Sequence, residues 1–373
     1  MAAGESTTPV SRRLATSITA HAWNADGTML AISPNLPEVW IYVNCTERAT
    51  SKWEKKYVLA KHDLLVSGVD WCHATNAIVT CSHDRSAFVW NYDAEKDAWL
   101  PTTTVLRLPL SCTGVKWSDD GRKLAVASTA KVMPVLAYDA TQDWWVGKQL
   151  KAFKSSVTDI AWHPSGRVLA AASTDMVCRI FAVAWQEADG DNIDGAQFGT
   201  LPKFGEVLME LGQSKSWVHG VAWNPAGTSL AVTCHNATVY VVSWGEAGAA
   251  MDEIISQGLP STCVVYALSP ETGTFELVGQ VDPEVSTAAK VKGSFGSARA
   301  MFAAKVSKGQ DADAAAKDKL RTKHTAAISQ VRPRFEPGAA TTRKLSTCSV
   351  DGRVVEWDMA SAKLTVPLEV LGL

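Results

Sequence analysis

The sequence lacks a strong excess of charge, and it lacks long apolar runs. Its 36 Lys and Arg residues stand against 38 Asp and Glu residues, so no net field favours nucleic acid or an anionic membrane as a partner. No apolar run approaches the roughly 20 residues that span a bilayer, which argues against membrane insertion. Residues 1–17 contain no apolar core of the secretory type, so we expect no signal peptide there.

Signatures of catalysis and of cofactor binding are also lacking. The chain has no nucleophile elbow, no GxGxxG motif, no P-loop and no HExxH motif. Its eight cysteines are scattered and form no CxxC pair, which is typical of reduced, mostly buried thiols in a cytosolic protein. We therefore predict a protein that is not an enzyme and that has no cofactor or metal.

A recurring strand pattern explains much of the tryptophan content. Tryptophan supplies 15 of the 30 aromatic residues, and five tryptophans end short segments in which apolar residues alternate. Alternation with period 2 predicts a strand. Most of the segments are followed by a turn that ends in Gly, which supplies the positive φ that such turns need. The five segments are Ile18–Trp23, Val66–Trp71, Cys112–Trp117, Val157–Trp162 and Val218–Trp223.

Two more strands follow each segment, and the whole unit repeats about every 45 residues. The second strand is rich in small residues, as in Val168–Ser173, which indicates close packing on both of its faces. The repeat length is that of a four-stranded propeller blade. We predict an all-β, seven-bladed propeller that occupies residues 1–373 as a single domain. The third strands end near Tyr42, Trp90, Leu136, Phe181, Val242, Tyr266 and Trp357.

The pattern is irregular in the second half of the chain. Only 24 residues separate Val242 from Tyr266, so we expect an abbreviated sixth blade, and Ser243–Asp252 reads as a loop or short helix. The short interval could instead come from a gene prediction that lost a coding segment. An insertion at Gln186–Ser216 reads as a plain loop. The ring could close through residues 10–14, through residues 364–371, or through both.

A longer insertion, Glu284–Lys323, lies between the last two blades. It is rich in Ala, Lys and Ser, and it shows no strand pattern. Within it, apolar residues at helical spacing predict a short amphipathic helix that folds on a partner. The residues at this spacing are Phe295, Ala298, Met301, Phe302 and Lys305.

Two blades carry a pattern that resembles the His–Ser/Thr–Asp–Trp hydrogen-bond network of WD repeats. An Asp stands six residues before the Trp that ends the third strand, and a His lies 22 or 27 residues before that Asp. An Asp in a tight turn can accept hydrogen bonds from backbone and imidazole N–H groups. The predicted networks are His62, Asp84 and Trp90, and His324, Asp351 and Trp357.

More specific motifs resemble one family of WD-repeat proteins. They occur in order along nearly the whole chain: Thr19–Asn24, Val79–Trp90, Asp143-Trp-Trp-Val146, Trp162-His-Pro164, Cys178–Phe181 and Trp217-Val-His-Gly220. This sequence is similar to the propeller subunit of the seven-protein actin-related protein two/three complex, which nucleates branched actin filaments. The match departs from that family in the shortened sixth blade and in Pro333, which stands where the last blade would have its Trp.

The resemblance implies a non-catalytic scaffold in the cytoplasm and cytoskeleton, at the actin-rich cell cortex. Its implied partners are the other subunits of the complex, the actin filament and nucleation-promoting factors. It also implies that the inserted helix enters a hydrophobic groove of actin, with Phe295, Met301 and Phe302 as apolar anchors. Basic residues would then face an acidic filament surface, namely Lys290, Lys292, Arg299 and Lys305. The alternative is another WD-repeat scaffold, such as a substrate adaptor of a ubiquitin ligase.

Tryptophans outside the repeat are candidates for contacts with other subunits. The five that recur blade by blade are expected to pack between blades, whereas tryptophan is enriched in the cores of protein interfaces. The candidates for subunit contacts are Trp144, Trp145, Trp185 and Trp217.

Overall fold

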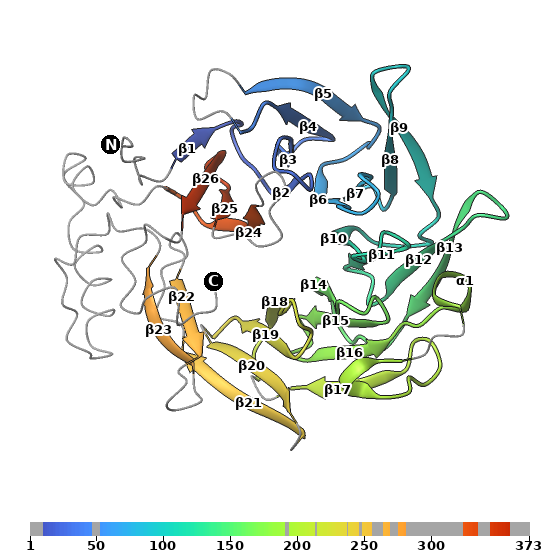
Figure 1. Ribbon diagram of the computed structural model, residues 1–373, viewed down its shortest axis with the longest axis vertical. Coiled ribbons are helices and arrows are strands. Elements are labelled where there is room, and N and C mark those ends of the chain that lie inside the picture. The colour runs from blue at the N-terminus through green and yellow to red at the C-terminus, as the bar shows by residue number, and fades with distance from the viewer. Residues whose placement is uncertain are drawn as a thin grey trace, which may run out of the picture.

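The computed structural model describes most of the chain between residues 10 and 358. The described ranges are 10–46, 53–190, 194–212, 215–236, 238–245, 248–255, 264–268, 275–280, 324–334 and 344–358. They contain six four-stranded antiparallel sheets and one two-stranded sheet, arranged around a centre (Figure 1). The chain is an all-β propeller, as predicted, and each four-stranded sheet is one blade.

The first three blades follow one another along the chain. Blade 1 contains β2 (Ala20–Trp23), β3 (Leu30–Ser33), β4 (Glu38–Val43) and β5 (Glu54–Ala60). Blade 2 contains β6 (Val66–Trp71), β7 (Ile78–Ser82), β8 (Ala87–Asp93) and β9 (Ala98–Thr104). Blade 3 contains β10 (Cys112–Trp117), β11 (Lys123–Ser128), β12 (Met133–Asp139) and β13 (Trp144–Leu150).

The remaining sheets complete the described part of the ring. Blade 4 contains β14 (Val157–Trp162), β15 (Val168–Ser173), β16 (Cys178–Ala182) and β17 (Val207–Leu211). Blade 5 contains β18 (Val218–Trp223), β19 (Ser229–Cys234), β20 (Thr238–Gly245) and β21 (Gly248–Ile255). The two-stranded sheet contains β22 (Val264–Leu268) and β23 (Phe275–Gln280). The closing blade contains β24 (Ile328–Arg334), β25 (Lys344–Ser349), β26 (Arg353–Asp358) and β1 (Val10–Arg13).

The first strand of each blade lies nearest the centre and the last lies at the rim (Figure 1). The second strands are sandwiched between neighbouring blades, so every residue of β3, β7, β11 and β15 is buried. This confirms the prediction that small residues there allow close packing on both faces. All seven described cysteines are buried thiols, and none of them forms a disulfide.

The N-terminal strand closes the ring. Strand β1 pairs antiparallel with β26, with Val10 opposite Glu356 and Arg13 opposite Arg353. Glu356 forms ion pairs with both Arg12 and Arg334, and the Arg12 guanidinium lies 4.0 Å from the centre of the Trp53 ring. Of the closures left open by the sequence, the one through residues 10–14 is therefore present, while residues 364–371 lie outside the described residues.

The expected loop or short helix at Ser243–Asp252 is wrong for the residues described there. Strands β20 and β21 form the outer hairpin of blade 5, in which Ser243 is opposite Ala250 and Gly245 is opposite Gly248. The apolar run that ends at Val242 is part of β20, which continues to Gly245. Strand β21 begins with the small residues Gly248, Ala249 and Ala250, so the alternation that predicts a strand is weak there.

The insertion Gln186–Ser216 is also not a plain loop. It contains the short helix α1 (Gln186–Asp189), a 3-10 turn at Ala196–Phe198 and the outer strand β17 of blade 4. The buried Lys123 pairs with Asp189, and Arg167 donates to the Asp194 carbonyl at 2.7 Å. Gln197 donates to the Gly227 carbonyl at 2.6 Å, so the segment is fastened to blades 3, 4 and 5.

Three further predictions concern the long insertion, membrane-spanning helices and metal sites. The insertion Glu284–Lys323 lies outside the described residues, together with its predicted helix. Within the described ranges, no helix is long and apolar enough to cross a membrane. The same part of the chain contains no group of three His, Cys, Asp or Glu side chains placed to hold a metal ion.

Candidate functional site

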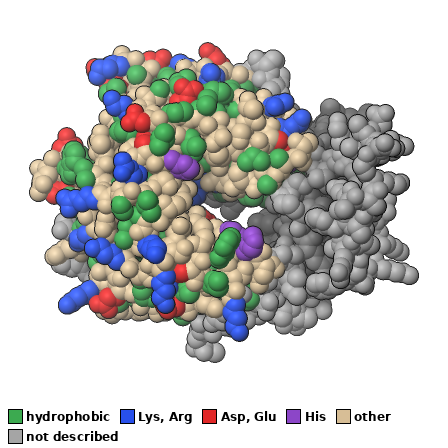
Figure 2. All heavy atoms as spheres, turned by 180° about the vertical axis from the view of Figure 1, so that it is seen from behind, with side chains coloured by type: hydrophobic (Ala, Val, Ile, Leu, Met, Phe, Trp, Pro, Cys, Tyr) green, Lys and Arg blue, Asp and Glu red, His purple; other side chains and the backbone are tan. Residues whose placement is uncertain are grey.

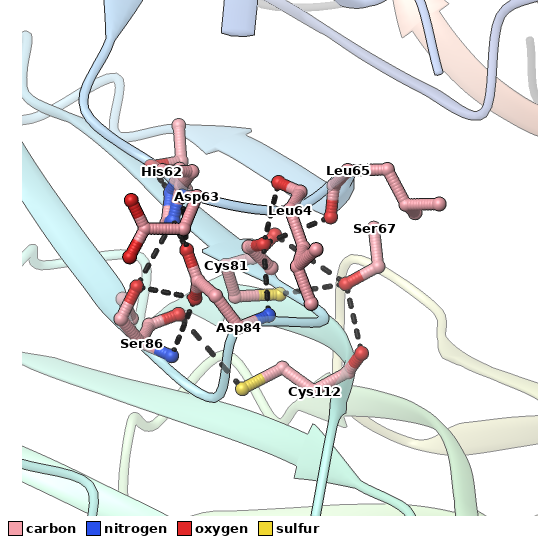
Figure 3. Close-up of polar contacts among 12 residues, drawn as sticks. His62, Asp63, Leu64, Leu65, Ser67, Cys81, Asp84, Ser86 and Cys112 are labelled. Carbon is pink, nitrogen blue, oxygen red and sulfur yellow. Dashed lines mark hydrogen bonds and ion pairs between the residues drawn. The ribbon is translucent and has the colours of Figure 1, made fainter. Parts of the chain in front are cut away.

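The first predicted network is formed in blade 2 and lies between a blade connection and a turn (Figure 3). His62 Nδ1 lies 3.0 Å from Asp84 Oδ2, and His62 Nε2 lies 2.8 Å from Thr80 Oγ1. The Trp90 indole N–H donates to the same Thr80 hydroxyl at 3.0 Å. Because an ionised carboxylate only accepts, Nδ1 carries the proton and Nε2 accepts from the threonine hydroxyl.

The closing blade repeats this arrangement. His324 Nε2 lies 2.7 Å from Thr347 Oγ1, and the Trp357 indole donates to that hydroxyl at 2.8 Å. His324 Nδ1 lies 3.5 Å from Asp351, whose carboxylate also accepts from the Thr325 amide at 2.7 Å. The predicted residues thus lie together in both blades, with the His–Asp hydrogen bond present in blade 2 and a longer His–Asp contact in the closing blade.

The two threonines are network members that the sequence analysis did not name. Thr80 and Thr347 each stand ten residues before the network Trp. That shared spacing is the signal that could have identified them. In each blade the hydroxyl joins the second strand to the third, while the Asp joins the blade connection to the turn.

Burial and hydrogen bonding fix the charge states in the blade 2 network. Burial lowers the pKa of His62, against the opposing effect of Asp84, so the imidazole is neutral at pH 7. Burial alone would raise the pKa of Asp84, but hydrogen bonds from Ser86 and from the Asp63 amide outweigh it and lower that pKa. The result is a neutral His beside an ionised Asp.

The networks support loops that gather on one face of the ring. Since each blade is antiparallel, the turns between second and third strands lie on the same side as the connections between blades. In five blades, a backbone hydrogen bond joins the turn between the second and third strands to the connection that leads into the same blade. These bonds run from His83 N to Leu65 O, Thr129 N to Ser111 O, Thr174 N to Ser156 O, His235 N to Trp217 O, and Val350 N to Ala327 O. We call this side the connecting-loop face. Its described segments are residues 14–20, 33–38, 61–66, 82–87, 105–112, 128–133, 151–157, 173–178, 211–212, 215–218, 234–236, 324–328 and 349–353.

The connecting-loop face combines exposed apolar and basic side chains. Its exposed large apolar residues are Leu36, Leu64, Val105, Leu110, Met176, Trp217 and Val350. Its exposed basic residues are Lys61, Arg85, Arg107, Lys131, Lys151, Lys154 and Lys215. Within the described segments of this face, Asp63 is the one exposed acidic residue. Figure 2 shows basic and hydrophobic side chains interspersed on one side of the molecule, with acidic side chains also present and His side chains near the central opening. Such a mixture is typical of a surface that binds an acidic, partly apolar partner.

The four tryptophans predicted to contact other subunits divide into two groups. Trp144 and Trp217 are 42% and 48% exposed, so both rings are accessible at the surface. Trp145 and Trp185 are only 7% and 2% exposed, and they lie in the core. Their burial removes Trp145 and Trp185 from the accessible surface and leaves Trp144 and Trp217 as the candidates.

Trp145 is buried because it belongs to a second recurring set of tryptophans. It packs edge-on against Trp117 with ring centres 5.5 Å apart, as Trp99 packs against Trp71 at 5.4 Å. Trp53 packs edge-on in the same way against the inner Trp23 of blade 1, whereas Trp244 on β20 lies tilted, at 33°, against Trp223 of blade 5. The interval of 46 residues between Trp99 and Trp145 was the available signal. Trp185 instead packs against Phe204, and Lys148 Nζ lies 4.1 Å from its ring centre.

The predicted actin-binding residues are not placed by the structure. Phe295, Arg299, Met301, Phe302 and Lys305 all fall in residues 281–323, outside the described ranges. Within the described residues, the candidate functional site consists of the connecting-loop face and the two exposed tryptophans.

Comparison with known proteins gives two matches, one to a repeat family and one to full-length relatives. Residues 53–91, 146–181 and 205–243 match the family described as WD domain, G-beta repeat. Actin-related protein 2/3 complex subunit 1B of Arabidopsis thaliana is 34% identical over 369 residues, which cover 93% of this chain and 95% of that protein. The chain belongs to the family of subunit 1 of the actin-related protein 2/3 complex.

Two further relatives agree with this assignment. Subunit 1A from Arabidopsis thaliana is also 34% identical, with the same coverage of 93% and 95%. Subunit 1A-B from Xenopus laevis is 32% identical over 366 residues, which cover 91% of this chain and 94% of that protein. All three relatives are named as subunit 1 of that complex, and the resemblance extends over more than nine-tenths of this chain.

Proposed function

We propose that this chain is a non-catalytic scaffold subunit of an actin-related protein 2/3 complex, where it supports the nucleation of branched actin filaments. The observation that carries the proposal is the resemblance to subunit 1 proteins over more than nine-tenths of both chains. The ring suits a scaffold, because buried networks connect strands within blade 2 and within the closing blade, and β1 completes the closing blade. Its partners are the other subunits of the complex, and its location is the actin cytoskeleton of the cell cortex.

The proposed ring has seven blades, of which the sixth is abbreviated. The two-stranded sheet β22–β23 lies between blade 5 and the closing blade along the chain, which supports this count. A seventh blade leaves no long open edge in the ring, and an open edge would invite pairing with other chains.

The connecting-loop face is the proposed contact for nucleation-promoting factors. Its seven exposed basic residues and one exposed acid favour an acidic segment of the partner. Its exposed apolar residues, Trp217 among them, offer places for apolar side chains of that segment. Trp144 lies at the rim on β13 and is the proposed contact for a neighbouring subunit.

The insertion 284–323 is the proposed contact with the actin filament. A helix with Phe295, Met301 and Phe302 on one side would enter a hydrophobic groove, while Arg299 and Lys305 would meet acidic groups. Replacement of Met301 and Phe302 by Ser should slow branching in a pyrene-actin assay while the complex still assembles. Unchanged branching would exclude the helix as an actin contact.

Affinity purification of the tagged chain tests the scaffold role itself. We expect two actin-related proteins and four or five small subunits to copurify. Recovery of ubiquitin-ligase subunits in their place would instead identify a substrate adaptor and would reject the proposal.

A further inference from the structure

A repeated hydroxyl hydrogen bond joins the innermost strands of successive blades. In each case a Ser or Thr one residue before or after the start of the first strand donates to a backbone carbonyl of the next blade. The pairs are Thr19 to Val66 O (3.3 Å), Ser67 to Cys112 O (2.9 Å), Thr113 to Val157 O (2.7 Å), Thr158 to Val218 O (2.7 Å) and Ser329 to Ile18 O (2.9 Å). These five bonds link the closing blade and blades 1 to 5 into one series.

His219 stands at the same position in blade 5. Like Ser67 and Thr158, it lies at a β-bulge, where the register shifts between Val218 and Gly220. In place of the hydrogen bond to the next blade that Ser or Thr makes at this position, the larger imidazole of His219 contacts a residue of its own blade. His219 Nε2 lies 2.8 Å from Nδ1 of His235, which follows strand β19.

The two imidazoles are accessible from the connecting-loop face. Both His219 and His235 are exposed, and their ring centres lie 5.0 Å apart. Trp217 covers one side of the pair, with its ring centre 5.2 Å from that of His235. The two rings thus share an exposed imidazole–imidazole hydrogen bond beside an indole, with one ring nitrogen donating to the other.

We propose that His219 Nε2 and His235 Nδ1 bind a divalent transition-metal ion of the copper(II) type. Imidazole nitrogens bind such ions at about 2.0 to 2.1 Å, so two ligands at a right angle stand about 2.9 Å apart. His219 Nε2 and His235 Nδ1 lie 2.8 Å apart, so both can reach one ion once the bridging proton has moved to the far nitrogen of its ring. Among divalent first-row ions, nitrogen ligands bind copper(II) most tightly, which favours copper(II) as the occupant.

The His pair supplies only part of a coordination shell. Among the described residues, no third His, Cys, Asp or Glu joins the pair. The remaining coordination positions are therefore open to water or to a donor atom of a bound partner.

Copper(II) titration of the full chain tests the site. Because copper(II) quenches a nearby indole, we expect Trp217 fluorescence to fall with a stoichiometry of one ion per chain, and calorimetry to give the same stoichiometry. His219→Thr and His235→Ala should each weaken binding by at least about tenfold, since loss of a ligand costs no less than loss of its supporting partner. Trp217→Phe should remove the quenching and leave the calorimetric binding in place.

His83→Ala is the matched control, because His83 is an exposed histidine on the same face without a second imidazole beside it. Binding that survives either His219→Thr or His235→Ala, or that His83→Ala weakens equally, overturns the proposal. The His219→Thr variant also restores the hydroxyl of the other blades, so its melting temperature should not fall below that of the wild type. A loss of copper binding with intact melting therefore reports the ligand and not unfolding.

Discussion

Arg332 on β24 donates to the Asp70 carboxylate on β6 at 2.9 Å, although blade 1 stands between their blades in the ring. The same carboxylate accepts from the Trp117 amide at 2.9 Å and lies 4.0 Å from Lys116 Nζ. Asp70 thus connects the closing blade, blade 2 and blade 3 around the centre. An ion pair that spans the ring stabilises its closure in addition to the pairing of β1 with β26.

Asp70→Asn should therefore destabilise the whole ring and not blade 2 alone. The amide keeps an acceptor for Trp117 N, but the charges of Arg332 and Lys116 lose their partner. We expect a loss of about 2 to 4 kcal/mol in the free energy of unfolding, measured by urea denaturation. Asp63→Asn, on the exposed connection of the same blade, should have almost no effect. Equal stability of Asp70→Asn and wild type would contradict a role for this pair in closure.

Lys116 should give the ring a distinctive pH dependence. Burial and the nearby Arg332 lower its pKa to about 8, against the opposing effects of Asp70 and Asp159. The folded protein therefore loses this proton at a lower pH than the unfolded chain, for which the pKa is 10.5. Between these values the unfolded chain holds more protons, so the contribution of Lys116 to stability rises with pH.

Lys116→Met removes the titrating amine, so the difference in stability between wild type and variant reports the titration of Lys116 alone. We expect the variant to be more stable than wild type at pH 7, and we expect the difference to shrink as the pH rises from about 8 toward 10. Urea midpoints of both proteins at pH 7, 8, 9 and 10 measure the difference. A difference that is constant over this range would show that Lys116 does not titrate in the window.

The Thr80 hydroxyl joins His62 to Trp90, so its removal should leave two buried polar groups without a partner. Thr80→Val has nearly the same volume, and we expect it to cost about 2 to 4 kcal/mol of folding free energy. Thr80→Ser keeps the hydroxyl and is the matched control, with a smaller expected loss. Thermal and urea unfolding measure both variants, and equal losses would assign the effect to packing rather than to hydrogen bonding.

The repeat could be predicted from the sequence because each blade repeats the same local rules. The alternating segments that end in Trp71 or Trp117 are strands for local reasons, and the networks of Asp84 and Asp351 follow from fixed spacing. Contacts across the ring carry no such signal. Arg332 and Asp70 are far apart in sequence and belong to no motif, so only closure of the ring brings them together.

Burial of individual tryptophans was harder to predict for a related reason. Adjacent residues on a strand face opposite sides, so Trp144 is exposed while Trp145 packs on Trp117. When Trp144 and Trp145 are treated as one motif, the sequence does not indicate which of the two side chains is exposed and which is buried. The same limit applies to the hairpin of β20 and β21, where small residues such as Ala249 and Ala250 weaken the alternation.

Basic residues of the connecting-loop face should control the response to an acidic partner. Lys151→Glu combined with Lys154→Glu reverses two exposed charges on the connection between blades 3 and 4. We expect binding of an acidic nucleation-promoting segment to weaken by about tenfold in fluorescence anisotropy, with a smaller difference at high salt because exposed charges are screened. Lys96→Glu, on the turn between β8 and β9 at the opposite side, is the control and should bind as wild type does. Equal weakening by Lys96→Glu would show a general charge effect and would contradict recognition by the connecting-loop face.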